Sequence, residues 1–309
     1  MIKYWKQEEK GLAEIFTYEK GCWMDLESPS KEEIDLLVNE FRVPEDFIND
    51  ILDIDERSRT EIEGRWLLII IRIPVYLSKH TVPFYTIPMG VLISPHVTIT
   101  ISLYESEVTN PKVLSKFKTF NINNRHNFVL YLLLRSSSLY LNYLKVINRQ
   151  TNNIEKEIQK ATKNSELQAL LRMEKSLVYY QTSLKSNEML IMKLQRIKLA
   201  QSEQVDEDLL EDVIVENKQA SEMAKIHSDI LAGLMDAFAS VISNNVNVVM
   251  KQLTVITIIL MIPTLVASVF GMNVPNGMEA NKYALWIIMG VSFGVAIAGV
   301  FIFRKRNIF

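Results

Sequence analysis

The stretch LTVITIILMIPTLVASVF, residues 253–270, decides the fold of this chain. It lies inside a longer segment, residues 252–278, that contains no charged side chain. An α-helix needs roughly 20 predominantly apolar residues to cross the hydrocarbon core of a bilayer. We therefore expect a first transmembrane span at about residues 252–270.

A second uncharged run covers residues 283–303 and stops at Arg304, Lys305 and Arg306. Two such runs predict a transmembrane hairpin, and the alternative is a pair of helices buried in a soluble core. Basic residues favour the cytoplasmic side of a membrane. Two spans then return the chain to its starting side, so we expect a multi-pass protein of the cell (inner) membrane with both termini in the cytoplasm.

The charges are divided unevenly along the 309 residues, whose net charge is −2. Residues 251–309 hold five basic residues and one acid, a net charge of +4, which leaves −6 for residues 1–250. This balance gives no general attraction to nucleic acid, so we expect no nucleic-acid partner. A single cysteine, Cys22, excludes an intramolecular disulfide framework and any multi-cysteine metal site.

The region before the hairpin changes character near residue 120. Residues 66–75 and 89–103 are rich in Ile and Val and predict strands, whereas residues 30–40 begin with an N-cap serine and have helical apolar spacing. Residues 127–251 contain no proline and only one glycine, which predicts long helices. We expect a cytoplasmic α/β domain at residues 1–120, a long-helix stalk at 121–250, and the hairpin with its basic tail at 251–309. Turns are predicted near residues 163–165 and 202–207.

A narrow polar stripe follows the last long helix at alternating steps of four and three residues. Its members are polar residues or methionines: Asp236, Ser240, Ser243, Asn247, Met250, Thr254, Thr257, Met261, Thr264 and Ser268. A strict 3.5-residue period keeps one face of a helix directed at a supercoil axis. The stripe has two interpretations: close packing between membrane helices, or the lining of an aqueous path between several copies.

The residues around the end of the first span resemble the CorA-type magnesium transport family. The resemblance rests on Gly271, Met272 and Asn273, with Phe270 before them, and on residues 247–254 upstream. It extends more weakly to Trp23, residues 49–52 and residues 66–75.

This resemblance implies a funnel-shaped homopentamer in which five first-span helices surround the pore. It assigns Asn273 as the selectivity residue, which contacts the ion through its hydration shell, with Gly271 and Met272 holding the loop. The matching pore-lining positions are Asp236, Asn247, Met250, Leu253, Met261 and Thr264. Mg²⁺ is then substrate and regulatory ligand, no cofactor is expected, and the partners are the lipid bilayer, divalent cations and further copies of the chain.

The resemblance also implies regulation by cytoplasmic Mg²⁺, bound between subunits at Asp50 and Asp212. Several positions depart from the family pattern. Asn49 stands where an acid is usual, and residues 136–139 replace an acidic stretch. The external loop has a single acidic residue, Glu279, where the family commonly has several. Phe270 replaces a tyrosine, and Pro263 does not directly follow Met261.

Gly-Met-Asn does not determine the metal, so a zinc, cobalt or nickel transporter on the same scaffold is the first alternative. From a different class, the chain could be a membrane-anchored sensor or scaffold that conducts nothing. We do not expect an enzyme, because we find no nucleophile–base pairing and no cluster of metal ligands in the sequence.

Overall fold

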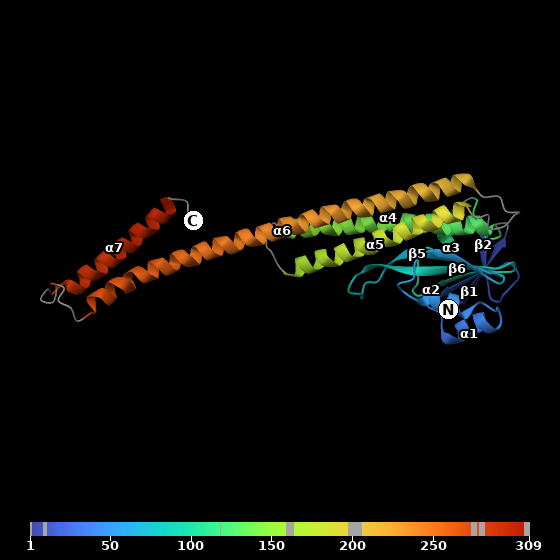
Figure 1. The fold of residues 1–309 in the computed structure, drawn as a ribbon, viewed down its shortest axis with the longest axis horizontal. Coiled ribbons are helices and arrows are strands. Elements are labelled where there is room, and N and C mark those ends of the chain that lie inside the picture. The colour runs from blue at the N-terminus through green and yellow to red at the C-terminus, as the bar shows by residue number, and fades with distance from the viewer. Residues whose placement is uncertain are drawn as a thin grey trace. The chain divides into compact units, whose positions relative to one another are not determined.

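The computed structural model describes residues 2–8, 11–117, 119–158, 164–196, 206–272, 277 and 282–305 (Figure 1). These residues form two compact units, Met1–Met235 and Asp236–Phe309. The first combines a β-sheet with helices, and the second consists of the end of one very long helix and a further apolar helix. The predicted combination of an α/β domain, long helices and two apolar C-terminal helices is confirmed, and the domain limits at residues 120 and 250 stay predictions.

A seven-stranded sheet with the order β2-β1-β3-β7-β6-β5-β4 forms the centre of the first unit. Neighbouring strands are antiparallel except for the parallel pair β3 and β7. The strands are β1 Ile2–Glu8, β2 Gly11–Ile15, β3 Trp23–Glu27, β4 Arg59–Glu63, β5 Trp66–Tyr76, β6 Phe84–Ile93 and β7 Thr98–Ser102.

The helices of both units have the following bounds: α1 Lys31–Asn39, α2 Glu45–Leu52, α3 Pro111–Leu114, α4 Arg125–Ile158, α5 Asn164–Arg196, α6 Glu207–Phe270 and α7 Ala284–Lys305. Ser30 caps α1 in a reciprocal capping box with Glu33, as its sequence predicts. The turns predicted near residues 163–165 and 202–207 fall largely on residues outside the described ranges.

The expected strand at residues 89–103 is in fact the end of β6, a tight turn and β7. The turn is closed by the Ser94 backbone N–H, which donates to the Val97 carbonyl at 3.0 Å. Pro95 lies within it and has no N–H to offer a sheet. The Ile-rich and Val-rich segments on both sides of Ser94, Pro95 and His96 hid this break.

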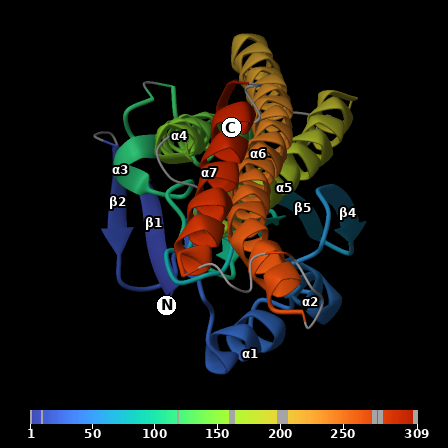
Figure 2. The same cartoon turned by 90° about the vertical axis from the view of Figure 1, so that its left-hand side faces the viewer.

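Both faces of the sheet are buried, which explains the long apolar runs in β5 and β6. Alternate residues of β5, such as Ile69 and Ile71, join a core with α4 and α5. Their neighbours Leu68 and Ile70 join a second core with α1 and α2 on the opposite side of the sheet (Figures 1 and 2). Gly90 of β6 lets α2 approach closely, because a Cβ there would lie 2.2 Å from Ile51 Cδ1.

The buried Arg72 fastens α5 to the sheet. Its guanidinium donates to the carbonyls of Ile54 at 2.6 Å, Glu56 at 3.0 Å and Thr86 at 2.9 Å. Its backbone N–H donates to Asn187 Oδ1 at 2.9 Å, and Asn187 Nδ2 donates back to the Arg72 carbonyl at 2.8 Å. Burial lowers the pKa of Arg72. With Ser183 Oγ of α5, which accepts from Arg72 Nε at 3.4 Å, neutral acceptors from three segments replace the water that this cation loses.

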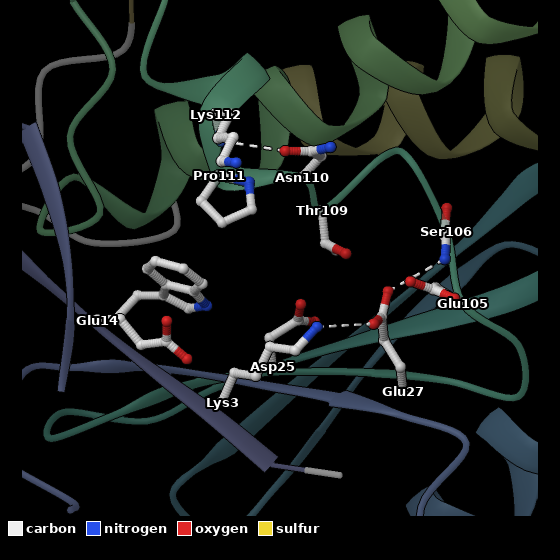
Figure 3. A pocket seen from close by; sticks show the side chains of 11 residues that line it. Lys3, Glu14, Asp25, Glu27, Glu105, Ser106, Thr109, Asn110, Pro111 and Lys112 are labelled. Atoms are coloured by element: carbon white, nitrogen blue, oxygen red, sulfur yellow. Dashed lines mark hydrogen bonds and ion pairs between the residues drawn. The ribbon is translucent and has the colours of Figure 1, made fainter. Parts of the chain in front are cut away.

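A second buried ionisable group, Asp25 on β3, lines a cavity of about 310 Å³ (Figure 3). Thr100 Oγ1 donates to Asp25 Oδ1 at 2.6 Å, and Trp23 Nε1 donates to Thr100 Oγ1 at 2.8 Å. The charged groups around the same cavity are Lys3, Glu14, Glu27, Glu105 and Lys112. Burial raises the pKa of Asp25 to about 7, against the opposing hydrogen bond from Thr100.

Asp25→Asn should stabilise the protein at neutral and alkaline pH. A carboxyl whose pKa rises from 3.8 to about 7 on folding makes the wild type less stable as the pH rises between these values, by about 1.4 kcal/mol per unit. The gain from the variant is then largest above pH 7 and absent below pH 4. Urea unfolding of the detergent-solubilised chain, followed by tryptophan fluorescence, measures it. The control is Glu14→Gln, which changes an exposed acid of the same cavity. An equal pH-dependent gain in both variants contradicts the assignment to Asp25.

Candidate functional site

The two C-terminal helices have the length and composition of membrane spans. The most apolar 18-residue windows of Glu207–Phe270 and Ala284–Ile302 both have a mean hydropathy of 2.4. Only 6% and 11% of these windows are buried within the chain. Core helices of a soluble protein are mostly buried, so this alternative is disfavoured. The apolar surface of both helices needs lipid or other chains to cover it.

One face of α6 packs against α7, which runs back beside it (Figures 1 and 2). On α6, Val255 is buried and Ile262 is half-buried. On α7, the small residues Ser292 and Ala296 are buried four residues apart. At Gly299, an added Cβ would lie 3.9 Å from Ile262 Cδ1. Small residues allow two membrane helices to approach closely without a large side chain between them.

Within the span, Thr257 and Thr264 of the polar stripe lie about half a turn from Val255, and Thr254 lies about 100° from it, at 100° per residue. Every member is exposed in the single chain, as is Leu253: Asp236, Ser240, Ser243, Asn247, Met250, Leu253, Thr254, Thr257, Met261, Thr264 and Ser268. Residues 239–254 are exposed on every side of α6, so exposure in the single chain is compatible with a lining role for the stripe, which stays a prediction.

Four of the six hydroxyl groups of this stripe have a common hydrogen-bond pattern, in which the hydroxyl donates to the helix carbonyl four residues earlier. The four bonds are Ser240 to Asp236 at 3.1 Å, Thr254 to Met250 at 2.8 Å, Thr257 to Leu253 at 2.8 Å and Thr264 to Leu260 at 2.9 Å. A hydroxyl has one hydrogen and two lone pairs. Because the hydrogen is used within the helix, the oxygens remain available as acceptors, which suits the hydrogen atoms of water around a cation.

Helix α6 ends directly before the Gly-Met-Asn segment. The Gly271 N–H donates to the Ala267 carbonyl at 2.9 Å, and the Met272 side chain is exposed. An added Cβ at Gly271 would lie 3.1 Å from the Ala267 carbonyl oxygen, so glycine suits this tight helix end. Asn273, the predicted selectivity residue, and Glu279 lie outside the described residues.

The predicted regulatory residues lie on separate elements, and no contact between Asp50 and Asp212 is recorded among the described residues. Asp50 on α2 forms an ion pair with Arg59, whereas Asp212 is exposed on α6. Burial, the largest influence, raises the pKa of Asp50, and Arg59 opposes this rise. Within the described part of the chain, no group of three or more His, Cys, Asp or Glu side chains could hold a metal.

Two features of the first unit change the interpretation of the sequence. Ser136 and Ser137, where an acidic stretch was expected from the resemblance, are buried in α4, and Ser136 Oγ donates to the Arg72 carbonyl at 3.4 Å. Arg59 was not singled out from the sequence. The signal was present, because arginine here stands between two acids, Glu56 and Glu61, but its pairing with Asp50 depends on the position of α2.

Comparisons with known proteins agree with this geometry. A family model described as CorA-like Mg²⁺ transporter protein matches residues 18–305. A cobalt/magnesium transport protein CorA from Methanocaldococcus jannaschii is 24% identical over 290 residues, which cover 92% of this chain and 90% of that protein. A protein of the same name from Thermotoga maritima is 22% identical over 264 residues, 84% of this chain and 75% of its own. The complete structure of the CorA magnesium transporter from M. jannaschii superposes with a TM-score of 0.79 at 21% identity and covers 99% of this chain and 98% of its own.

Cysteine substitution distinguishes a water-lined stripe from a packing seam. Thr257→Cys and Thr264→Cys should react with a charged, membrane-impermeant thiol reagent in vesicles at least about tenfold faster than Ile256→Cys. Ile256 is also exposed in the single chain but lies off the stripe. The native Cys22 is buried, so the background is low. Equal rates at all three positions contradict a water-lined face.

Proposed function

The chain belongs to the CorA-like Mg²⁺ transporter family, and from that premise we propose that it conducts hydrated Mg²⁺ through a pore enclosed by copies of α6. The observation that carries the proposal is the polar stripe, which is exposed on the face of α6 opposite α7. Hydroxyl groups at membrane depth face a protein partner or water rather than lipid. Five copies in a closed ring direct the stripe inward and leave the apolar faces to α7 and lipid.

The chemistry of the stripe suits a cation that keeps its water. Mg²⁺ loses its hydration shell reluctantly. Neutral oxygens accept hydrogen bonds from the bound waters without removing them, and they bind the ion weakly enough for release. The back-bonded threonines, such as Thr257 and Thr264, provide such oxygens. At the outer end, a ring of Asn273 carbonyls performs the same task and selects the ion.

Closure depends on the apolar members of the same face. Met250, Leu253 and Met261 are all exposed on α6. In a ring of five, each becomes an apolar constriction, which can stop conduction by losing its water. No nucleotide is required for transport, since a divalent cation that moves inward gains about 4.6 kcal/mol per 100 mV of membrane potential.

We further propose a homopentamer in the cell (inner) membrane with both termini in the cytoplasm. The 3.5-residue period of the stripe supports a supercoiled ring of α6 helices, and Lys305 at the end of α7 supports a cytoplasmic C-terminus. The regulatory part of the proposal is that cytoplasmic Mg²⁺ bound near Asp50 and Asp212 favours the closed ring. Carboxylates of neighbouring subunits repel one another in the closed ring. A cation bound between them cancels this repulsion and so stabilises the closed ring.

Two other functions remain as alternatives, and only the first has specific support. The relatives from M. jannaschii and T. maritima are named cobalt/magnesium transport proteins, so cobalt is the first competing substrate, ahead of zinc and nickel. A non-conducting membrane sensor would use the same hairpin, but it gives no reason for a stripe of acceptor oxygens on an uncovered face.

Flux measurements test the transport proposal. Purified protein in vesicles should take up Mg²⁺ when the interior is negative, and Asn273→Ala should reduce this flux at least about tenfold or admit competing Co²⁺, Zn²⁺ or Ni²⁺. The matched control is Asn281→Ala, the same change at another position of the same loop. Magnesium flux that is unchanged in Asn273→Ala contradicts the assignment of the pore mouth. No flux in the wild type favours the non-conducting sensor.

Protease sensitivity tests the regulatory part separately. Mg²⁺ should protect residues 1–235 of the solubilised wild type, and Asp212→Lys should remove this dependence, because the new cation either mimics or repels the bound ion. Asp229→Lys makes the same charge change at another exposed position of α6 and should leave the dependence intact. Protection that persists unchanged in Asp212→Lys argues against a role for this carboxylate.

A further inference from the structure

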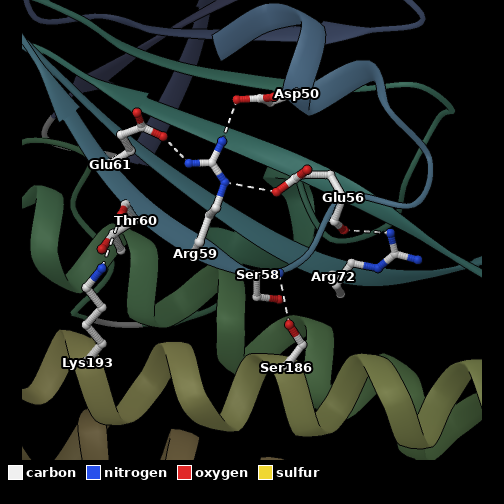
Figure 4. A network of polar contacts seen from close by, with 9 residues as sticks. All are labelled: Asp50, Glu56, Ser58, Arg59, Thr60, Glu61, Arg72, Ser186 and Lys193. Atoms are coloured by element: carbon white, nitrogen blue, oxygen red, sulfur yellow. Dashed lines mark hydrogen bonds and ion pairs between the residues drawn. The ribbon is translucent and has the colours of Figure 1, made fainter. Parts of the chain in front are cut away.

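Three carboxylates surround the guanidinium of Arg59 at the start of β4 (Figure 4). Arg59 Nε donates to Glu56 Oε1 at 2.9 Å, and the two terminal nitrogens contact Glu61 and Asp50. The acids come from three places in the chain: Asp50 from α2, Glu56 from the connection after it, and Glu61 from β4 itself. One positive charge therefore serves three negative charges, and the group keeps a net charge of −2.

Hydrogen bonds to Arg72 and to α5 hold the backbone that precedes Arg59. Arg72 donates to the carbonyls of Ile54 and Glu56. The next residues are fastened to α5, since the Ser58 N–H donates to Ser186 Oγ at 2.9 Å and Ser58 Oγ donates to Asn187 Oδ1 at 2.7 Å (Figure 4). The backbone is fixed before Arg59 by these bonds and at Arg59 by the pairing of β4 with β5, so the side chain is the part that can leave the carboxylates.

We propose that Arg59 is a tethered counter-cation that competes with a divalent cation for the carboxylate of Asp50 and so sets the cation concentration at which the protein responds. The inference rests on the proposed regulatory role of Asp50. The guanidinium contacts one of the two Asp50 carboxylate oxygens, and a divalent ion bound to this carboxylate repels it, so binding of the ion favours withdrawal of Arg59. Glu56 and Glu61 lose their counter-ion at the same moment and add their charge to the attraction for the incoming ion.

The exposure of the cluster allows such an exchange. The side chains of Arg59 and Asp50 are 33% and 34% exposed, and those of Glu56 and Glu61 are 23% and 44% exposed. Partly exposed ion pairs are screened by solvent and are individually weak. A hard divalent cation that prefers oxygen ligands can displace an arginine held in this way, whereas it could not displace a fully buried pair without exposing unpaired charge.

Arg59→Gln tests the competition directly. The midpoint of Mg²⁺-dependent or Mn²⁺-dependent protection against protease, measured on the full-length protein in detergent, should move to a concentration at least about tenfold lower than in the wild type. Arg57→Gln is the matched control, because Arg57 is exposed, lies two residues away and carries the same charge outside the cluster. It should move the midpoint less than about threefold. Arg59→Lys, which keeps the charge but loses the planar fork, should lie between the wild type and Arg59→Gln.

A second substitution tests that the gain passes through Asp50. In the background of Arg59→Gln, the change Asp50→Asn should abolish the tighter response, as seen by protease protection and by direct titration with Mn²⁺. A midpoint in Arg59→Gln that is unchanged or raised overturns the proposal, as does an equal shift in Arg57→Gln. The same holds for a gain that survives Asp50→Asn.

The readout is independent of transport, so the two proposals can fail separately. Vesicles that conduct no Mg²⁺ while the Arg59→Gln midpoint still shifts contradict the proposed pore and support the counter-cation. Normal Mg²⁺ flux with no shift contradicts the counter-cation alone.

Discussion

The structure depends on a constraint that the membrane imposes on helix α6: a polar side chain at that depth must meet protein or water. Residues 252–270 form two faces of α6, and each face meets this constraint with a different neighbour. Val255 and Ile262 pack against α7, whereas Thr257 and Thr264 lie on the opposite side. Within a single chain nothing covers that second face among the described residues. In the proposed assembly of several chains this face turns inward, where it meets protein or water and would line the path for ions.

The small residues of α7 make this division of faces possible. Ser292 and Ala296 are buried on α7, and a Cβ added at Gly299 would lie 3.9 Å from Ile262 Cδ1, so this face of α7 is the one that lies next to α6. A bulkier α7 would sit further away and would leave the back of α6 to lipid as well. In the hairpin, α6 therefore has two different faces: one lies next to α7, and the other carries the polar stripe.

The features that sequence predicted are those that depend on local periodicity. The stripe from Asp236 to Ser268, the capped helix after Ser30 and strand β5 follow from spacing along one element, because helix and strand periods are fixed by backbone geometry. The break at Pro95 was missed, since apolar residues continued on both sides of it. The pairing of Arg59 with Asp50 could not be predicted, because it depends on how closely α2 approaches β6 at Gly90, a distance set by tertiary packing.

The threonines of α6 carry a further consequence, for protons rather than metal ions. A hydroxyl can pass a proton along a row of waters only if its own hydrogen is free to move to the next oxygen. Thr254, Thr257 and Thr264 have committed that hydrogen to a carbonyl of their own helix. None of these three threonines can act as a relay without breaking this bond, so a proton that passes them must travel through water. The proposed path could therefore admit a hydrated cation while these threonines take no part in proton transfer across the membrane.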